Sequence, residues 1–194
     1  MMPRISVEVA VVGGSSGAIG ALVELLPALS PATPFPVIVV VHVPAQRPSL
    51  LAKIFGARCA LPVKEPLDKE PLAPGVWFAP PDYHVLVSDQ HSFVLSDDEP
   101  VNFSRPSIDV LFESAADVFG GNVLAVVLTG ANEDGARGAA AVRDAGGFVA
   151  VQDPGTAEVP VMPAAAIRRA RPQLVAPLPV IAELLSNLSR ASAP

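Results

Sequence analysis

VEVAVVGGSSGAIG (residues 7–20) joins a nearly continuous apolar run to a glycine-rich turn. An apolar run without polar alternation is typical of a strand that is covered on both faces, as in a parallel sheet. Beyond the turn, Leu22, Leu25, Leu26 and Leu29 recur at the spacing of one helix face. This stretch therefore predicts a strand, a tight turn and a helix, which is the repeating unit of α/β proteins.

Three more apolar runs of strand length follow along the chain. They are PVIVVVH (36–42), VLAVVL (123–128) and FVAV (148–151). A second amphipathic helical pattern lies between them and is formed by Ile108, Leu111, Phe112, Ala115 and Phe119. Because strands and helices alternate, we expect an α/β fold of the Rossmann-like type. Its sheet is doubly wound and mostly parallel, with about seven strands and with helices on both faces.

The middle of the chain, GVWFAPPDYHVLVSDQHSFVLSDD (75–98), has a different pattern. Its short β-rich pieces are divided by Pro80 and Pro81 and by polar residues 88–91, which predicts an antiparallel hairpin or small flap inserted in the sheet order. The helical pattern resumes at Pro106, a residue suited to the first turn of a helix. The tail, residues 178–194, predicts a closing helix.

Composition limits the organisation of the chain and its partners. The 194 residues are 51% hydrophobic, which predicts one globular domain over residues 1–194. The 13 basic and 19 acidic residues give a net charge of −6, which disfavours a nucleic-acid binder. Cys59 is the single cysteine, so neither an intramolecular disulfide nor a zinc site of several thiolates is expected. Without a secretory signal or an apolar run long enough to span a bilayer, we expect a soluble, cytoplasmic protein with no membrane insertion.

Polar residues follow three of the predicted strands. Their ends read GGSSGAIG (13–20), HVPAQ (42–46) and TGANEDGARG (129–138). Because the carboxyl ends of parallel strands meet at one edge of a sheet, we expect these segments to lie together. They supply a serine, a histidine and an acid, the set that acyl transfer through a covalent serine intermediate requires.

The chemistry needs these three residue types for separate reasons. A serine hydroxyl is a weak nucleophile until a base takes its proton, and the base works best when a third group fixes its tautomer. The first turn also presents backbone N–H groups that can stabilise an oxyanion. The residues alone leave the nucleophile open between Ser15 and Ser16, and the acid between Glu133 and Asp134; the base is His42.

Each of these residues also has a structural explanation when it is considered alone. Serines in a glycine-rich turn are most often helix caps or phosphate ligands. His42 follows an apolar run, as a hydrogen-bonded core histidine does. Asp134 precedes a glycine and a helical run, as a helix N-cap does. Their joint placement at three strand ends favours the catalytic interpretation.

Other polar residues favour structural roles. His84 and His91 fall in the predicted flap, where a solvated or structural role is expected. Arg168, Arg169 and Arg171 are typical of a solvated helix face, with contact to an acidic protein surface as the alternative.

A nucleotide-binding α/β protein is the competing interpretation of the first turn. The glycine spacing of short-chain dehydrogenases requires glycine where Ile19 stands. Strand two ends without the acidic residue that binds ribose, and Tyr83 is followed four residues later by Val87 instead of lysine. The G-x-S-x-G elbow of α/β-hydrolases is also absent. A dehydrogenase and a common α/β-hydrolase are therefore disfavoured.

Six segments, in order, carry a resemblance to one family. They are VVGGSSGA, VVVHVP, GVWFAPPDYH, RPSIDVLF, LTGANEDGARG and VPVMPAAA. The chain resembles, over almost its whole length, the catalytic domain of chemotaxis protein-glutamate methylesterases, the CheB type. The resemblance implies hydrolysis of glutamyl methyl esters on the cytoplasmic helices of chemoreceptors with release of methanol and, for many members, deamidation of receptor glutamines.

The resemblance also implies the roles of individual residues. The family's nucleophile falls on Ser15, its base on His42 and its acid on Asp134, while its oxyanion-hole donors fall on the backbone N–H groups of Ser16 and Ala131. No metal and no cofactor is implied. The methylated cytoplasmic domain of a chemoreceptor is the expected partner.

Departures from the family pattern are few. Threonine is usual where Ser16 stands, glycine where Ala18 stands and methionine where Ala131 stands. Many members carry an N-terminal phospho-receiver domain, whereas this sequence begins at the first strand. We therefore expect a standalone enzyme that is unregulated, is controlled by a separate chain, or works in a pathway that does not steer motility. The alternative is a catalytically weak module that docks on receptor-like helices.

Overall fold

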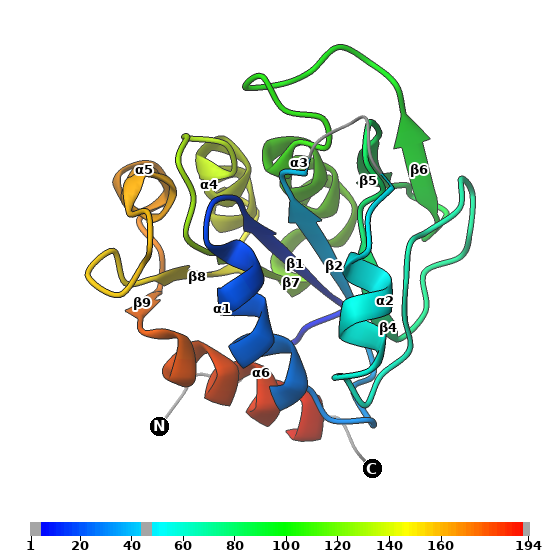
Figure 1. Ribbon diagram of the computed structural model, residues 1–194, viewed down its shortest axis with the longest axis horizontal. Helices are drawn as coiled ribbons and strands as arrows, with labels where there is room; N and C mark the ends of the chain where they lie inside the picture. Colours follow the sequence, from blue (N-terminus) through cyan, green and yellow to red (C-terminus); the bar gives the residue numbers. More distant parts are fainter. Residues whose placement is uncertain (1–4, 44–47, 192–194) are drawn as a thin grey trace.

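The computed structural model describes residues 5–43 and 48–191. Its centre is a seven-stranded sheet with the order β3-β4-β2-β1-β7-β8-β9, and every pair of neighbours is parallel (Figure 1). The strands are β1 (Val9–Gly14), β2 (Pro36–Val41), β3 (Val63–Lys64), β4 (Gly75–Phe78), β7 (Val123–Val127), β8 (Phe148–Gln152) and β9 (Leu174–Ala176). The predicted doubly wound parallel sheet is confirmed.

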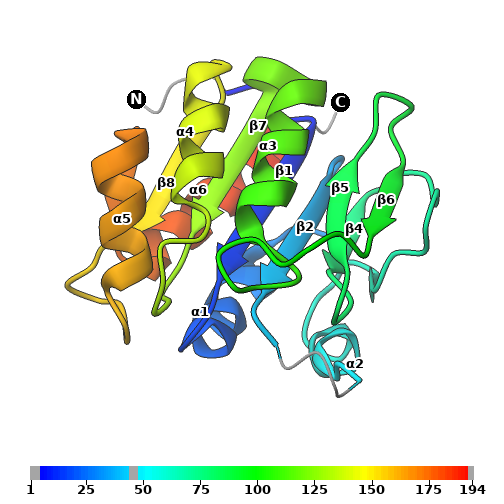
Figure 2. The ribbon, with the colours of Figure 1, turned by 90° about the horizontal axis from the view of Figure 1, so that it is seen from above.

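Helices cover both faces of the sheet, as Figures 1 and 2 show. One face packs against α1 (Ala18–Leu25), α2 (Leu51–Gly56) and α6 (Leu178–Ala191). The other face packs against α3 (Ile108–Phe119), α4 (Ala136–Asp144) and α5 (Val161–Ala170). Short 3-10 turns, η1 (Leu26–Ala28) and η2 (Gly120–Asn122), extend α1 and α3.

The uninterrupted apolar strands are explained by these two cores. Along β1, Val9 and Val11 belong to the core under α3, whereas Ala10 and Val12 belong to the core under α1 and α6. Alternate side chains of a strand point to opposite faces, so a strand between two helical layers must be apolar at every position. All six residues of β1 and of β2 are buried.

The predicted inserted hairpin is present but is shorter than the segment that suggested it. β5 (His84–Val87) pairs antiparallel with β6 (Phe93–Ser96), and Val85, Val87 and Phe93 pack in the same core as α3. Figure 2 shows the hairpin beside α3. The GVWF piece is not part of this hairpin. It forms β4, which pairs parallel with β2 in the main sheet, and all four of its residues are buried.

Two other local predictions need correction. Pro106 lies before α3, not in its first turn, since Ser107 is the N-cap and the helix begins at Ile108. The expected first strand is displaced: β1 spans Val9–Gly14 and so includes both glycines that precede Ser15. Residues 44–46 of the expected second turn and residues 192–194 of the expected closing helix lie outside the described residues.

Within the described residues, no helix has both the length and the apolar character needed to cross a membrane.

A glycine on α4 sets the distance between α3 and α4. A Cβ at Gly138 would lie 2.5 Å from the Cβ of Phe112 and 3.0 Å from the backbone Cα and O of Asp109. Because these neighbours are backbone or backbone-proximal atoms, neither helix can make room without moving.

We therefore expect Gly138→Ala to lower the free energy of unfolding by about 1–3 kcal/mol through overpacking. Gly20→Ala is the matched control, since nothing lies within 4 Å of a Cβ there, and it should raise stability by about 0.5–1 kcal/mol through helix propensity. Urea unfolding of both variants measures the difference. Equal stability of Gly138→Ala and the parent would contradict the close approach of the two helices.

Candidate active site

The structure brings three of the predicted site residues together at the carboxyl edge of three neighbouring strands. Ser15 directly follows β1, His42 directly follows β2, and Asp134 lies in the loop between β7 and α4. The His42 Nδ1 atom lies 3.2 Å from the Ser15 Oγ atom, and the His42 Nε2 atom lies 2.8 Å from the Asp134 Oδ2 atom. The imidazole thus bridges the hydroxyl and the carboxylate.

The orientation of the imidazole fixes its tautomer. A carboxylate only accepts hydrogen bonds, so the Nε2 atom must carry the proton that it donates to Asp134. In the neutral ring Nδ1 is then unprotonated and accepts the hydrogen of the Ser15 hydroxyl. Serine proteases use the two nitrogens the other way round, with Nε2 on the serine. In either arrangement one ring nitrogen faces the hydroxyl and the other faces the carboxylate.

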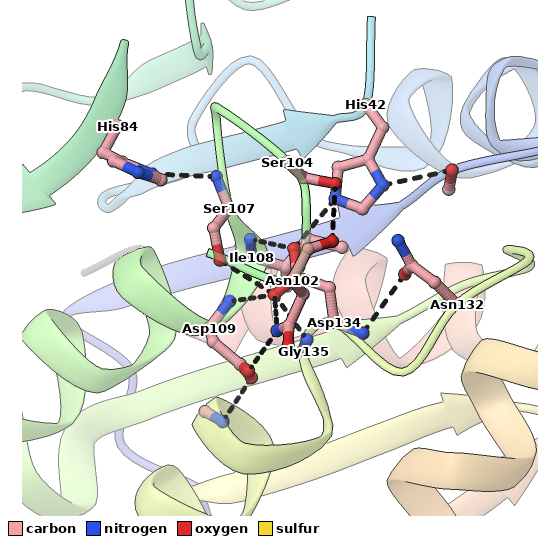
Figure 3. A network of polar contacts seen from close by, with 12 residues as sticks. His42, His84, Asn102, Ser104, Ser107, Ile108, Asp109, Asn132, Asp134 and Gly135 are labelled. Carbon is pink, nitrogen blue, oxygen red and sulfur yellow. Dashed lines mark hydrogen bonds and ion pairs between the residues drawn. The ribbon is translucent and has the colours of Figure 1, made fainter. Parts of the chain in front are cut away.

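Asp134 is fully buried and has an unusual number of hydrogen-bond donors around it (Figure 3). Its Oδ2 atom accepts from His42 and from the Ile108 N–H at 2.7 Å. Its Oδ1 atom accepts from the Ser107 hydroxyl at 2.8 Å and from the Asn102 side-chain amide at 3.0 Å. The N–H groups of Asp109 and Gly135 complete the set, each at 3.1 Å from Oδ1.

This environment favours the ionised form of the acid. Burial alone raises the pKa of Asp134, but the hydrogen bonds from His42, Ile108, Asn102 and Asp109 outweigh it and hold the pKa below its usual value. Two of these donors are N–H groups at the start of α3, where the positive end of the helix dipole also favours an anion. Asp134 is therefore charged at neutral pH, as its predicted role as the orienting acid requires.

A second carboxylate lies behind the first. Asp109, also buried, accepts the Gly138 N–H in the first turn of α4 at 2.7 Å. Asn102 links the two acids, since its side-chain amide donates to the Asp109 Oδ2 atom at 2.9 Å and to the Asp134 Oδ1 atom at 3.0 Å. Burial and the neighbouring Asp134 raise the pKa of Asp109. Asp134 thus accepts N–H groups at the start of α3, and Asp109, a residue of α3, accepts an N–H group in the first turn of α4.

Sequence reasoning missed this supporting layer. The sequence pattern predicts no role for Asn102, Ser107 or Asp109, although Ser107 and Asp109 belong to the RPSIDVLF segment. The sequence does contain an indication of this role. A serine and an aspartate lie at the start of a predicted helix whose other inward positions are apolar. Ser107 and Asp109 both contact Asp134, which lies 25 or more residues further along the chain. Local sequence therefore does not predict these contacts.

The structural explanations considered for single residues are mostly wrong. The N-cap of α4 is Gly135, so Asp134 does not cap the helix that follows it. The N-cap of α1 is Gly17, so neither Ser15 nor Ser16 caps α1 through its side chain. Glu133, the other candidate acid, is exposed and lies 3.4 Å from Arg168. Ser15 and Asp134 are the serine and the acid that His42 contacts.

The expected structural roles of the flap histidines are confirmed. His84 is buried, and its Nδ1 atom accepts the Ser107 N–H at 3.1 Å while its Nε2 atom donates to the Glu99 carbonyl. His91 stacks on Phe119. His84 therefore supports the start of α3 at Ser107, whose hydroxyl is itself a donor to Asp134.

The first turn is tied to the loop that follows β7. The Ser15 N–H donates to the Thr129 carbonyl, and the Thr129 hydroxyl lies 2.9 Å from the Ser16 carbonyl. Among residues 5–43 and 48–191, neither the Ser16 N–H nor the Ala131 N–H has a hydrogen-bond acceptor. Both expected oxyanion donors are thus available, although their role stays a prediction. Ala18, where the family usually has glycine, fits because the neighbouring Gly14 has no side chain.

A pocket of about 400 Å³ opens beside His42. It is lined by His42, Val43, Asp82, Pro100, Phe103, Ser104, Arg105 and Pro106. In the part of the chain that the structure describes, no group of three or more histidine, cysteine, aspartate or glutamate side chains is placed to hold a metal ion. Ser15, His42 and Asp134 have the residue types and contacts that acyl transfer through a serine requires.

Comparison with known proteins places this site in a family. Residues 10–185 match the family described as CheB methylesterase. The chain belongs to the CheB methylesterase family. The crystal structure of the Thermotoga maritima CheB methylesterase catalytic domain superimposes with a TM-score of 0.90 at 34% identity, covering 95% of this chain and all of that one.

Curated relatives of this CheB-family chain differ in length. A Leptospira interrogans protein with the provisional name protein-glutamate methylesterase/protein-glutamine glutaminase is 41% identical over 184 residues, which cover 95% of its length. The Azospirillum brasilense protein-glutamate methylesterase/protein-glutamine glutaminase is 33% identical over 195 residues, which cover 50% of its length. The family and the fold inferred from the sequence motifs are confirmed.

The lowered pKa of Asp134 makes stability depend on pH. A carboxyl whose pKa is lower in the folded than in the unfolded state stabilises the fold above the unfolded value, near 4, and loses that contribution as the pH falls through the folded value. Asp134→Asn should therefore unfold at lower urea concentration than the parent at pH 7, and the gap should narrow below about pH 4.

Asp117→Asn is the matched control on the exposed side of α3, where the Asp117 side chain has no hydrogen-bond partner among the described residues. It should unfold like the parent at both pH values. A gap for Asp134→Asn that is the same at pH 7 and at pH 3 would contradict the assigned direction of the shift.

Proposed function

We propose that this chain, as a single catalytic domain over residues 1–194, hydrolyses glutamate methyl esters on the cytoplasmic helices of chemoreceptors and releases methanol. The continuous hydrogen-bonded chain from Ser15 through His42 to the buried Asp134 is the observation that carries the proposal. Relatives named for both methylesterase and glutaminase activity support the substrate, and they extend the proposal to deamidation of receptor glutamines.

The first half of the reaction forms an acyl-enzyme. The Ser15 Oγ atom attacks the ester carbonyl carbon while the His42 Nδ1 atom takes the hydroxyl proton. The resulting imidazolium keeps its Nε2–H bond to the ionised Asp134, which stabilises the new positive charge. The tetrahedral intermediate collapses as the carbon–oxygen bond to the methoxy group breaks and His42 returns the proton, so that methanol leaves.

The second half regenerates the enzyme. Water attacks the glutamyl ester on Ser15 while the His42 Nδ1 atom takes one of its protons, and the same proton then returns to the Ser15 oxygen as glutamate is released. With a glutamine side chain the leaving group is ammonia instead of methanol. No step requires a metal or a cofactor.

Two backbone N–H groups are proposed to stabilise the negative oxygen in both tetrahedral intermediates. They belong to Ser16 and Ala131, which lack hydrogen-bond acceptors in the described part of the chain. The hydrogen bonds of Thr129 to Ser15 and Ser16 hold the loop after β7 against the first turn. Since the donors are backbone groups, the departures from the family's usual side chains at these positions leave the chemistry intact.

Release of methanol from a methylated chemoreceptor cytoplasmic fragment tests the proposal. Ser15→Ala should abolish it, because the variant lacks the hydroxyl that contacts the His42 imidazole. Ser16→Ala is the matched control: it keeps the backbone N–H and should retain most of the activity. Undiminished turnover by folded Ser15→Ala would rule out Ser15 as the nucleophile. No release by the folded parent enzyme from several receptors would rule out the substrate and favour a docking module.

Asp134→Asn should lower kcat by about 10³–10⁴-fold, as in other triads. An asparagine amide can donate to Nε2 and so favour the tautomer with its proton on Nδ1, which cannot accept the Ser15 proton. Steady-state methanol release at matched folded concentration measures the loss. A decrease of less than tenfold would show that Asp134 does not set the tautomer of His42.

A further inference from the structure

Phe103 is the most exposed large apolar side chain in the described part of the molecule, with a relative exposure of 104%. It lies in the segment that connects β6 to α3, and its φ of 62° is in the left-handed region. Asn102 before it has a φ of 51°. Asparagine tolerates this conformation, whereas for a phenylalanine it is strained. Such strain persists only where surrounding contacts impose it.

The contacts that impose this conformation lie on both sides of Phe103. Asn102 is held by its hydrogen bonds to the two buried acids. The Arg105 guanidinium donates to the Asp82 carboxylate at 2.6 Å and to the carbonyls of Asp97 and Asp98 at 2.7 and 3.0 Å. The phenyl ring itself takes no part in this anchoring, because it is entirely exposed.

Phe103 also lines the pocket that contains His42 and Val43. A strained, firmly anchored segment therefore holds an aromatic ring at the mouth of the active site. A methyl ester at Ser15 is far too small to cover a ring that buries about 150–250 Å² when enclosed. Only a larger part of a substrate can do so.

We propose that Phe103 is the apolar anchor that docks the polypeptide carrying the ester, and that it packs against an apolar side chain of the substrate helix beside the modified glutamate. This inference rests on the proposed esterase function. Aromatic anchors of this kind carry a large share of the binding energy in protein interfaces. Phe103 acts on docking and specificity, and it takes no part in the bond-breaking steps.

The test compares a protein substrate with a small ester. For Phe103→Ala, kcat/KM for methanol release from a methylated receptor fragment should fall about tenfold or more, mainly through KM. Hydrolysis of p-nitrophenyl acetate should stay within twofold of the parent, since this ester needs only the site around Ser15. Phe103→Tyr keeps the ring and should restore the receptor activity. Leu67→Ala, at an exposed leucine outside the pocket, is the matched control and should change neither activity.

Phe103→Gly distinguishes the effect of the side chain from that of the backbone conformation. Glycine adopts a positive φ without strain, so this variant should melt about 2–4 °C above Phe103→Ala. Its receptor activity should nevertheless be as low as that of Phe103→Ala. If Phe103 served only the conformation of the segment, the glycine variant would keep full activity.

Three further results would overturn the proposal. Receptor activity of Phe103→Ala equal to that of the parent would show that the ring is not an anchor. An equal loss on the receptor fragment and on p-nitrophenyl acetate would place the effect in the chemistry or the fold. If the parent releases no methanol from the receptor fragment, the proposed function fails and this inference fails with it.

Discussion

The buried carboxylate of Asp134 is the constraint on which the site depends. A charged carboxylate is tolerated inside a protein only when its oxygens are satisfied, and here six donors satisfy them. Those donors come from His42, from residue 102 in the segment before α3, from the start of α3 and from Gly135. The same interaction therefore orients the base, sets the beginning of α3 and holds the segment that forms one wall of the pocket.

Hydrogen bonds between two acids and two helix starts also stabilise the site. Asp134 precedes α4 but accepts from the start of α3, whereas Asp109 lies in α3 but accepts from the start of α4. The close approach of the two helices at Gly138 makes this exchange possible. The packing of α3 against α4, on the face of the sheet opposite α1, thus determines the position of Asp134. The parallel pairing of β1 with β2 and β7 determines the positions of Ser15 and His42.

Much of this could be predicted from particular residues. The apolar runs predicted the parallel sheet, because strands between two helical layers are apolar at every position. The polar strand ends predicted which three segments would meet. The sequence pattern groups the GVWF segment with the flap, because proline and polar residues follow it. Only its pairing with β2 shows that it belongs to the main sheet. Asn102 was missed because its two partners lie 7 and 32 residues away.

The sequence by itself determined the fold class, the residues at the strand ends and the family, because these follow from local periodicity and from motifs a few residues long. The tertiary structure decided which nitrogen of His42 faces Ser15, which helix Asp134 stabilises, and that Phe103 stays outside the core beside the base. These features depend on distances between segments far apart in the chain, which are fixed only when the helices pack on the sheet.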